Sequence, residues 1–394
     1  MSSEDPIVIV GMARTAMGGL LGELSALSAN ELGALAVKAA LAEAGIAGDD
    51  VDQIYMGNVL GAGQGQAPAR QAAIKGGLPK SVEATTLNKM CGSGMQAAIM
   101  ARAAIASGEA SVIVAGGMES MTNAPHLLPT HRTGFKYGHD VIKDHMALDG
   151  LEDAYEHKAM GVYADMIARE HQFTREDQDA YALETLSRAL KATETGAFKR
   201  EITPATISGR GGDTVVDTDE LPKRARPDKI PQLKPAFSKD GTVTAANASA
   251  ISDGAAALVM MRRSEADRRG LKPLAKIVAT AAHAHEPAYF TTAPVPAMRK
   301  VTERAGWAMS DVDLWEINEA FAVVPMIAMK ELGLSHDVVN IHGGACALGH
   351  PIGASGARIL VTLIAALETR GLKKGVASLC IGGGEATAMA VELI

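Results

Sequence analysis

Cys91 lies in the stretch Met90 to Gly94, next to two glycines that bring no side chain near its sulfur. We expect these glycines to leave room for a substrate beside the thiol. An alanine-rich segment continues to Gly108 and predicts a helix that begins at the cysteine. The N–H groups and dipole of a helix N-terminus stabilise a thiolate, so we expect the pKa of Cys91 to be lowered. Cys91 is therefore a candidate nucleophile; a small buried apolar residue is the alternative.

His350 stands between Gly349 and Pro351, just before a second predicted helix that runs from Gly353 to Gly371. The glycine removes crowding and the proline fixes the backbone, so the imidazole is held in one place. A histidine held in this way can act as a base toward a thiol. An isolated loop histidine with a structural hydrogen bond is the competing interpretation.

Cys380 closes a predicted strand from Gly375 and precedes three glycines. In open α/β sheets ligands bind at the carboxyl ends of strands, where glycine amides can donate to a developing oxyanion. A phosphate-binding loop is disfavoured, because the glycine spacing does not fit a known phosphate-loop pattern. Asn318 follows another predicted strand, where its amide could hold a water against a carbonyl oxygen or cap a helix. Together these motifs predict that two thiols, an imidazole and an amide converge at one cleft.

An internal repeat indicates which elements position these residues. Residues 39–55 and 299–315 each read as a helix that ends at glycine, an acidic Asp-Val-Asp turn and a short strand. Further along each half, a predicted helix is followed by a strand: Ser111 to Ala115 in the first half and Gly375 to Cys380 in the second. We interpret the chain as two similar α/β halves with helices on both faces of the sheets. Chance similarity of common units is the alternative.

Residues 121–250 differ in character and are rich in His, Asp, Lys and Thr. Two helices are predicted there, Met160 to Glu170 and Arg175 to Thr195, the second with Thr174 as its N-cap. We expect this segment to be an inserted lid or binding platform. The resulting domains are residues 1–120 with 251–273, the insertion 121–250, and residues 274–394.

The composition is that of an ordinary globular protein of 394 residues with a net charge of −7, which favours neither nucleic acid nor a membrane surface as partner. Three scattered cysteines indicate a reducing, cytoplasmic setting. The acidic N-terminus, with no apolar leader, and the lack of a long uncharged apolar run agree with this expectation. The histidines of the insertion lack the spacing of metal ligands: His126, His131, His139 and His145.

Five stretches of the sequence resemble signature blocks of the thiolases. They are Asn88 to Gly94, Gly116 to Met121, Asn318 to Phe321, Gly349 to Gly356 and Cys380 to Gly384. The resemblance extends from Val8 to the C-terminus. It implies a five-layered αβαβα fold made of two similar halves, with a loop domain inserted in the first.

The resemblance also implies a mechanism, the reversible condensation of two acetyl-CoA to acetoacetyl-CoA and CoA. Cys91 would carry the acyl group as a thioester, His350 would take the thiol proton, and Cys380 would move a proton at the α-carbon. One oxyanion hole would combine His350 with a water on Asn318. The other would be formed by the backbone N–H groups of Cys91 and Gly382.

Coenzyme A thioesters would be the substrates, with no permanently bound cofactor. By resemblance, Ser249 contacts the pantetheine arm, and the cluster Lys223, Arg224 and Arg226 suits the nucleotide phosphates. Candidate residues of the acyl and CoA pocket are Met160, Phe237, Phe290, Ala320 and Phe321. The resemblance further implies a homodimer or a homotetramer built as a dimer of dimers.

Three positions depart from the short-chain biosynthetic pattern. Ala159 stands where many such enzymes have histidine, and Phe290 where they often have methionine. His342 resembles the residue found in degradative members that accept a broader range of acyl chain lengths. A degradative 3-ketoacyl-CoA thiolase is therefore the alternative. A ketoacyl synthase is disfavoured because its site pairs one cysteine with two histidines. A non-catalytic protein of the same fold would be expected to lack a reactive group, whereas all are present.

Overall fold

The computed structural model describes residues 5–209 and 211–394, and it divides the strands of the main sheet between two halves. The first half has the strand order β1-β11-β5-β3-β4 and the second has β12-β15-β14-β13. The strands of the first half are β1 (Ile7–Thr15), β3 (Gln53–Gly57), β4 (Glu83–Leu87), β5 (Val112–Ser120) and β11 (Ser252–Arg262). Those of the second are β12 (Ala275–Ala284), β13 (Leu314–Ile317), β14 (Lys374–Ile381) and β15 (Glu385–Leu393).

The two halves are equivalent strand by strand, which confirms the predicted repeat. In the first half β3 pairs in parallel with β4 and β5, and β11 runs antiparallel between β5 and β1. In the second, β13 pairs in parallel with β14, and β15 runs antiparallel between β14 and β12. An isolated parallel bridge between Trp315 and Val339 stands in the place of β4. This shared order excludes chance similarity of two short units.

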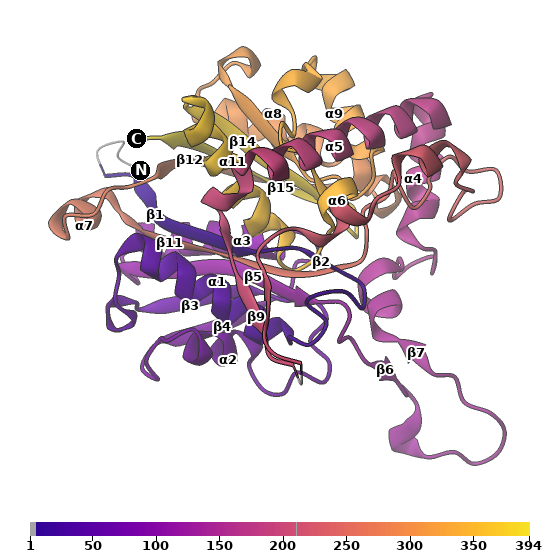
Figure 1. Ribbon diagram of the computed structural model, residues 1–394, viewed down its shortest axis with the longest axis horizontal. Helices are drawn as coiled ribbons and strands as arrows, with labels where there is room; N and C mark the ends of the chain where they lie inside the picture. The colour runs from indigo at the N-terminus through magenta and orange to yellow at the C-terminus, as the bar shows by residue number, and fades with distance from the viewer. Residues whose placement is uncertain (1–4, 210) are drawn as a thin grey trace.

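Helices cover both faces of each sheet and produce the five layers (Figure 1). α1 (Ala29–Ala44) and α2 (Pro68–Lys75) cover the outer face of the first sheet. α8 (Pro294–Ala305) and α9 (Val323–Leu332) cover the outer face of the second, and α3 (Ser93–Ser107) and α11 (Ser355–Arg370) lie between the sheets. The sheets join at one edge, where Val8 and Ile9 of β1 pair with Lys276 and Ala275 of β12.

Two glycines let α3 and α11 touch near their N-termini. A Cβ at Gly94 would lie 2.7 Å from the backbone nitrogen of Ala357, and one at Gly356 would lie 2.4 Å from that of Met95. A Cβ at Gly92 would likewise lie 2.3 Å from Cδ1 of Ile381. The expectation that Gly92 and Gly94 leave room for a substrate is therefore wrong. The space is filled by the other half of the protein, and this close approach brings the Cys91 and His350 segments together.

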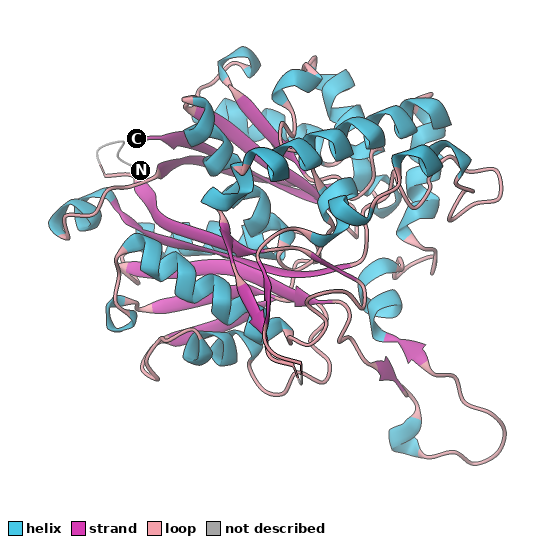
Figure 2. Cartoon of the chain, in the orientation of Figure 1, coloured by secondary structure: helices cyan, strands magenta, loops and turns pink. Residues whose placement is uncertain are grey.

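The chain between β5 and β11 forms α4 (Met160–Glu170) and α5 (Arg175–Thr195), with the predicted bounds. Thr174 caps α5, because its Oγ1 accepts from the backbone N–H of Asp177 at 3.1 Å. A hairpin of β6 (His126–Leu127) and β7 (Lys143–Asp144) extends away from the body (Figure 2). The remaining elements are β2 (Gly18–Gly19), β8 (Ile202–Thr203), β9 (Ala205–Ile207), β10 (Thr214–Val216), α6 (Glu220–Arg224), α7 (Arg263–Arg268) and α10 (Ala345–Leu348).

Within residues 5–209 and 211–394, no helix has both the length and the apolar character needed to cross a bilayer. Residues 1–4, which begin the acidic N-terminal stretch, lie outside the described residues.

Candidate active site

A cavity of about 530 Å³ lies where the two halves meet the segment 121–250. Most of its lining is apolar, and each of the three parts of the chain contributes to it. It brings together nine of the predicted site residues: Cys91, Met160, Phe237, Ser249, Phe290, Ala320, Phe321, His350 and Gly382. Asn318 and Cys380 are buried and do not line the cavity, and Arg224 lies outside it.

Cys91 lies in the turn that precedes α3, one residue before the N-cap Gly92. The prediction that the helix begins at the cysteine is therefore displaced by two residues. Met90, immediately before it, has a φ of 46°, a left-handed conformation that is strained for a residue with a side chain. The turn directs the Cys91 thiol toward its own N–H and that of Gly382, both of which donate to the sulfur.

The expected lowering of the Cys91 pKa is wrong. Cys91 is partly exposed, but its exposed surface faces an apolar cavity instead of open solvent. Burial therefore raises the pKa of Cys91 to about 11, although the N–H groups of Gly382 and Cys91 lower it. Removing the negative thiolate from water costs more than two amide donors return. The Cys91 thiol is thus neutral at pH 7.

This protonation state predicts how alkylation depends on pH. The rate of Cys91 carbamidomethylation by iodoacetamide is expected to rise about tenfold per pH unit between pH 6 and 9, because the thiolate fraction rises in proportion below the pKa. The modification can be followed by mass spectrometry of the peptide that contains Cys91. A rate that is already constant below pH 7 would instead indicate a thiolate paired with a protonated His350.

The ring of His350 is held in place by the hydroxyl of Ser355. Its Nδ1 lies 2.6 Å from Oγ of Ser355, and this hydroxyl donates to the carbonyl of Pro351 at 2.9 Å. Because the hydroxyl has one proton, it accepts from Nδ1–H, and the lone pair of His350 is left on Nε2. Burial, with a smaller effect from Arg358, lowers the pKa of His350 to about 3. The imidazole is therefore neutral and available as a base.

Asn318 and Cys380 come to the site from neighbouring parallel strands. Asn318 follows β13, donates its backbone N–H to the carbonyl of Ser378 at 3.0 Å, and places Nδ2 3.5 Å from each ring nitrogen of His350. Cys380 is buried near the end of β14. Burial and the nearby Cys91 raise the pKa of Cys380 well above its usual value. Two neighbouring thiols, an imidazole and an amide thus converge at one site, while their catalytic roles stay predictions.

Three aromatic rings form one wall of the cavity. The ring of Phe321 lies edge-on to Phe237 and to Phe290, with centroids 6.0 and 6.2 Å away. Phe237 lies against α4 at Gly161. A Cβ at this position would come within 2.2 Å of the ring, so only glycine leaves room for it. Ser249 is placed next to this wall by its backbone N–H, which donates to the carbonyl of Ala320 at 3.0 Å.

The predicted basic cluster is separate from the cavity. Lys223, Arg224 and Arg226 are exposed, and the guanidinium of Arg224 pairs with the carboxylate of Glu220 one turn earlier in α6. The proposed contact of this cluster with nucleotide phosphates therefore stays a prediction.

Sequence reasoning missed two residues that support the site. Ser355 holds the His350 ring, and Glu119 at the end of β5 accepts from the backbone N–H groups of Val59, Leu60 and Gly353. Burial raises the pKa of Glu119 to about 7, although these donors lower it. A carboxylate in a strand that is otherwise apolar was the available signal, since buried charges need specific partners. The serine gave no comparable signal.

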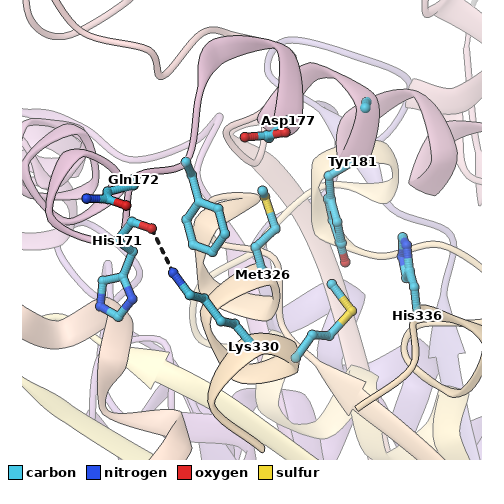
Figure 3. A pocket seen from close by; sticks show the side chains of 10 residues that line it. His171, Gln172, Asp177, Tyr181, Met326, Lys330 and His336 are labelled. Atoms are coloured by element: carbon cyan, nitrogen blue, oxygen red, sulfur yellow. Dashed lines mark hydrogen bonds between the residues drawn. The ribbon is translucent and has the colours of Figure 1, made fainter. Parts of the chain in front are cut away.

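A second hollow, of about 560 Å³, lies between α5, α9 and the segment that follows α4 (Figure 3). Lys330 reaches across it and donates to the carbonyl of His171 at 2.9 Å. Tyr181 lines this hollow and also donates to Glu319, the residue after Asn318, at 2.8 Å. None of the predicted site residues lines it.

The fold and the site define an α/β protein of two similar halves, with two thiols and an imidazole at the cleft between them. A family model of the thiolase N-terminal domain matches residues 7–264, and one of the thiolase C-terminal domain matches residues 271–393. The chain belongs to the thiolase family. This confirms the family expected from the signature blocks.

Several relatives match over the whole length of the chain. An acetyl-CoA acetyltransferase of Allochromatium vinosum is 48% identical over 388 residues, which cover 98% of each chain. One of Rhizobium meliloti is 49% identical over 391 residues, or 99% of each chain. A cytosolic acetyl-CoA acetyltransferase of Mus musculus is 47% identical over 395 residues, again 99% of each chain.

Proposed function

We propose that the protein is an acetyl-CoA C-acetyltransferase, which interconverts two acetyl-CoA with acetoacetyl-CoA and CoA. The observation that carries the proposal is the pair of neighbouring thiols, Cys91 and Cys380, next to the neutral imidazole of His350 and an apolar cavity. The relatives that match over the whole chain are acetyl-CoA acetyltransferases, which supports the same reaction. Reversible carbon–carbon bond formation needs one thiol as acyl carrier and a second as base.

In the first half-reaction the sulfur of Cys91 attacks the thioester carbonyl of acetyl-CoA, and Nε2 of His350 takes the thiol proton. The carbonyl oxygen becomes negative and is stabilised by the N–H groups of Cys91 and Gly382, which already point at this region. The carbon–sulfur bond to CoA then breaks. CoA leaves with the proton that His350 took up, so that the acetyl-enzyme has a neutral imidazole and a neutral Cys380 thiol.

In the second half-reaction His350 takes the proton of Cys380, and the resulting thiolate removes a proton from the methyl group of a second acetyl-CoA. Its raised pKa favours this step, because a weaker acid has a stronger conjugate base. His350 and a water held by Asn318 stabilise the enolate oxygen. The enolate carbon attacks the acetyl group on Cys91, the bond to this sulfur breaks, and the leaving thiolate takes the proton of His350. Every side chain thereby returns to its initial state.

A degradative 3-ketoacyl-CoA thiolase is the second candidate, and the structure removes one argument for it. His342 is buried with its ring edge-on to Phe198 and lies outside the cavity. Burial lowers the pKa of His342 to about 4. The resemblance of His342 to the residue in degradative members therefore does not reflect a contact with the substrate. Phe290, in contrast, lines the cavity and bears on acyl size.

Thiolysis of 3-ketoacyl-CoAs with four to sixteen carbons tests the choice between the two candidates. We expect kcat/KM to be highest for acetoacetyl-CoA and to fall about tenfold or more by six carbons, because each added methylene must fit against the aromatic wall. Equal or higher values at eight to twelve carbons would support the degradative enzyme.

We propose a homotetramer built as a dimer of dimers, acting in cytoplasmic acyl-CoA and fatty acid metabolism. The extended β6–β7 hairpin supports it, because it exposes Phe135, Tyr137, Val141 and Ile142 far from the core. A second copy would cover these side chains. Light scattering should report a smaller assembly when Tyr137 and Ile142 are replaced by aspartate; an unchanged mass would contradict the role of the hairpin.

Ser249 and the Lys223, Arg224 and Arg226 cluster are proposed to bind CoA, with no permanently bound cofactor.

A further inference from the structure

Behind the proposed catalytic groups lie two buried ionisable side chains that the mechanism does not use. Arg358 on α11 is fully buried, and its Nη1 lies 3.9 Å from Oε2 of Glu316 on β13. Along β13 successive side chains alternate: Trp315 and Ile317 pack on the outer face, whereas Leu314 joins the core between the sheets. Glu316 and Asn318 therefore share the inner face, toward α11.

Arg358 also contacts the amide of Asn318. Its Nη2 lies 3.4 Å from Oδ1 of Asn318, and Nδ2 of the same amide lies 3.5 Å from the ring nitrogens of His350. Among the residues that the structure describes, Nε and Nη1 of Arg358 have no hydrogen-bond partner. A guanidinium that is buried with so few hydrogen bonds is costly, which points to a role beyond stability.

We propose that Arg358, held next to Glu316, is a positioning residue that turns the Asn318 side-chain amide so that its N–H₂ group faces His350. The inference rests on the proposed function, because it concerns the hole that stabilises the enolate. An amide has an acceptor end and a donor end, and either end fits the same space. The cation attracts Oδ1, whereas a flipped amide would point its N–H groups at the guanidinium.

The charges around Arg358 fit this role. Burial lowers the pKa of Arg358, and Arg14 lowers it further, whereas Glu316, Glu201 and Glu319 raise it. Burial raises the pKa of Glu316 to about 8, against the lowering effect of Arg358, so this carboxyl is largely protonated at pH 7 and does not neutralise the guanidinium. Arg14 is itself paired with Glu201 and Asp219, which leaves Arg358 free to act on Asn318.

The test separates the two half-reactions of the full enzyme in Arg358→Met and Arg358→Lys. In Arg358→Met we expect the condensation rate to fall about 100-fold, while the single-turnover rate of CoA release on Cys91 acylation changes less than about threefold. KM for acetyl-CoA should change little. Arg358→Lys retains a cation, and its condensation rate should be at least about a tenth of the wild-type rate. Equal losses in both half-reactions would overturn the proposal and indicate a merely structural role.

A double-mutant cycle adds a measurement that does not depend on the size of the single effect. If Arg358 acts through Asn318, then Arg358→Met in an Asn318→Ala background should lower condensation less than about threefold further. Independent, multiplicative losses would overturn the proposal. Thr362→Val is the matched control, since Thr362 is buried on α11 one turn later and donates to Glu201 at 3.2 Å. It should leave both half-reactions unchanged.

The same experiment distinguishes the inference from the proposed function. A wild-type enzyme that does not acylate Cys91 or does not condense acetyl-CoA would contradict the proposed function. A wild-type enzyme that does both, with Arg358→Met variants that do so at the same rate, would contradict the positioning role alone. Circular dichroism of each variant identifies misfolding, and where Arg358→Met does not fold, Arg358→Lys and Arg358→Gln carry the test.

Discussion

Replacing Cys91 with serine is expected to lower the turnover of acetyl-CoA at least about 10⁴-fold. The hydroxyl of serine is far less acidic than a thiol, and the pKa of His350, lowered to about 3 by burial and by Arg358, makes this imidazole a weak base. A base that suffices for a thiol is therefore inadequate for a hydroxyl. The measurement is acetoacetyl-CoA formation together with covalent labelling by radioactive acetyl-CoA, which should disappear from the protein.

The other cysteines make this a controlled experiment. Cys346 does not line the cavity, and its backbone N–H donates to Glu319 at 3.0 Å. Burial raises the pKa of Cys346 well above its usual value. Cys346→Ser should retain the label and most of the activity. A stable acyl group on any other residue of the Cys91→Ser variant would refute the nucleophile assignment.

Replacing Cys380 with serine is expected to separate the two half-reactions. Acyl transfer to Cys91 should persist, whereas carbon–carbon bond formation should fall at least about 10³-fold, because a serine hydroxyl does not supply a base for the α-proton. The substitution changes one buried atom, so the packing around β14 should be retained. Label incorporation at Cys91 and acetoacetyl-CoA formation are measured on the same sample.

Two controls define the outcome for Cys380. The labelled variant should release its acetyl group when free CoA is added, which shows that the first half-reaction remains reversible. Condensation at the wild-type rate would remove Cys380 from the role of base. Loss of label as well would mean that the proton of Cys380 is indispensable to the departure of CoA in the first step.

The sequence predicted much of the fold because the relevant signals are local. The αL glycines that end α1 and α8, Gly45 and Gly306, have φ values of 68° and 69°, as expected for two copies of one unit. The capping threonine of α5 is equally local. Both copies of the helix–turn–strand unit bury the same faces. Their repeated pattern therefore predicted two similar sheets before any contact between distant residues was known.

The candidate site was predicted in part. The signature blocks marked Cys91, His350, Cys380 and Asn318, and the structure brings these residues together across β13, β14 and the turns before α3 and α11. The partners of these groups were not visible in the sequence. Ser355 lies in the same stretch as His350, but its residue type did not mark it as the partner of the ring. Arg358 contacts Asn318, which lies in a distant segment that shares no local pattern with it.

What the sequence determined by itself is therefore the repeat, the helix ends and the identity of the reactive groups, all of which depend on neighbours within a few residues. The tertiary structure decided the electrostatics. Burial raises the pKa of Cys91 instead of lowering it, and the space beside Gly92 and Gly94 belongs to Ile381 and Ala357 instead of a substrate. Both outcomes depend on how completely distant segments exclude water and fill volume, which is a property of packing between the halves.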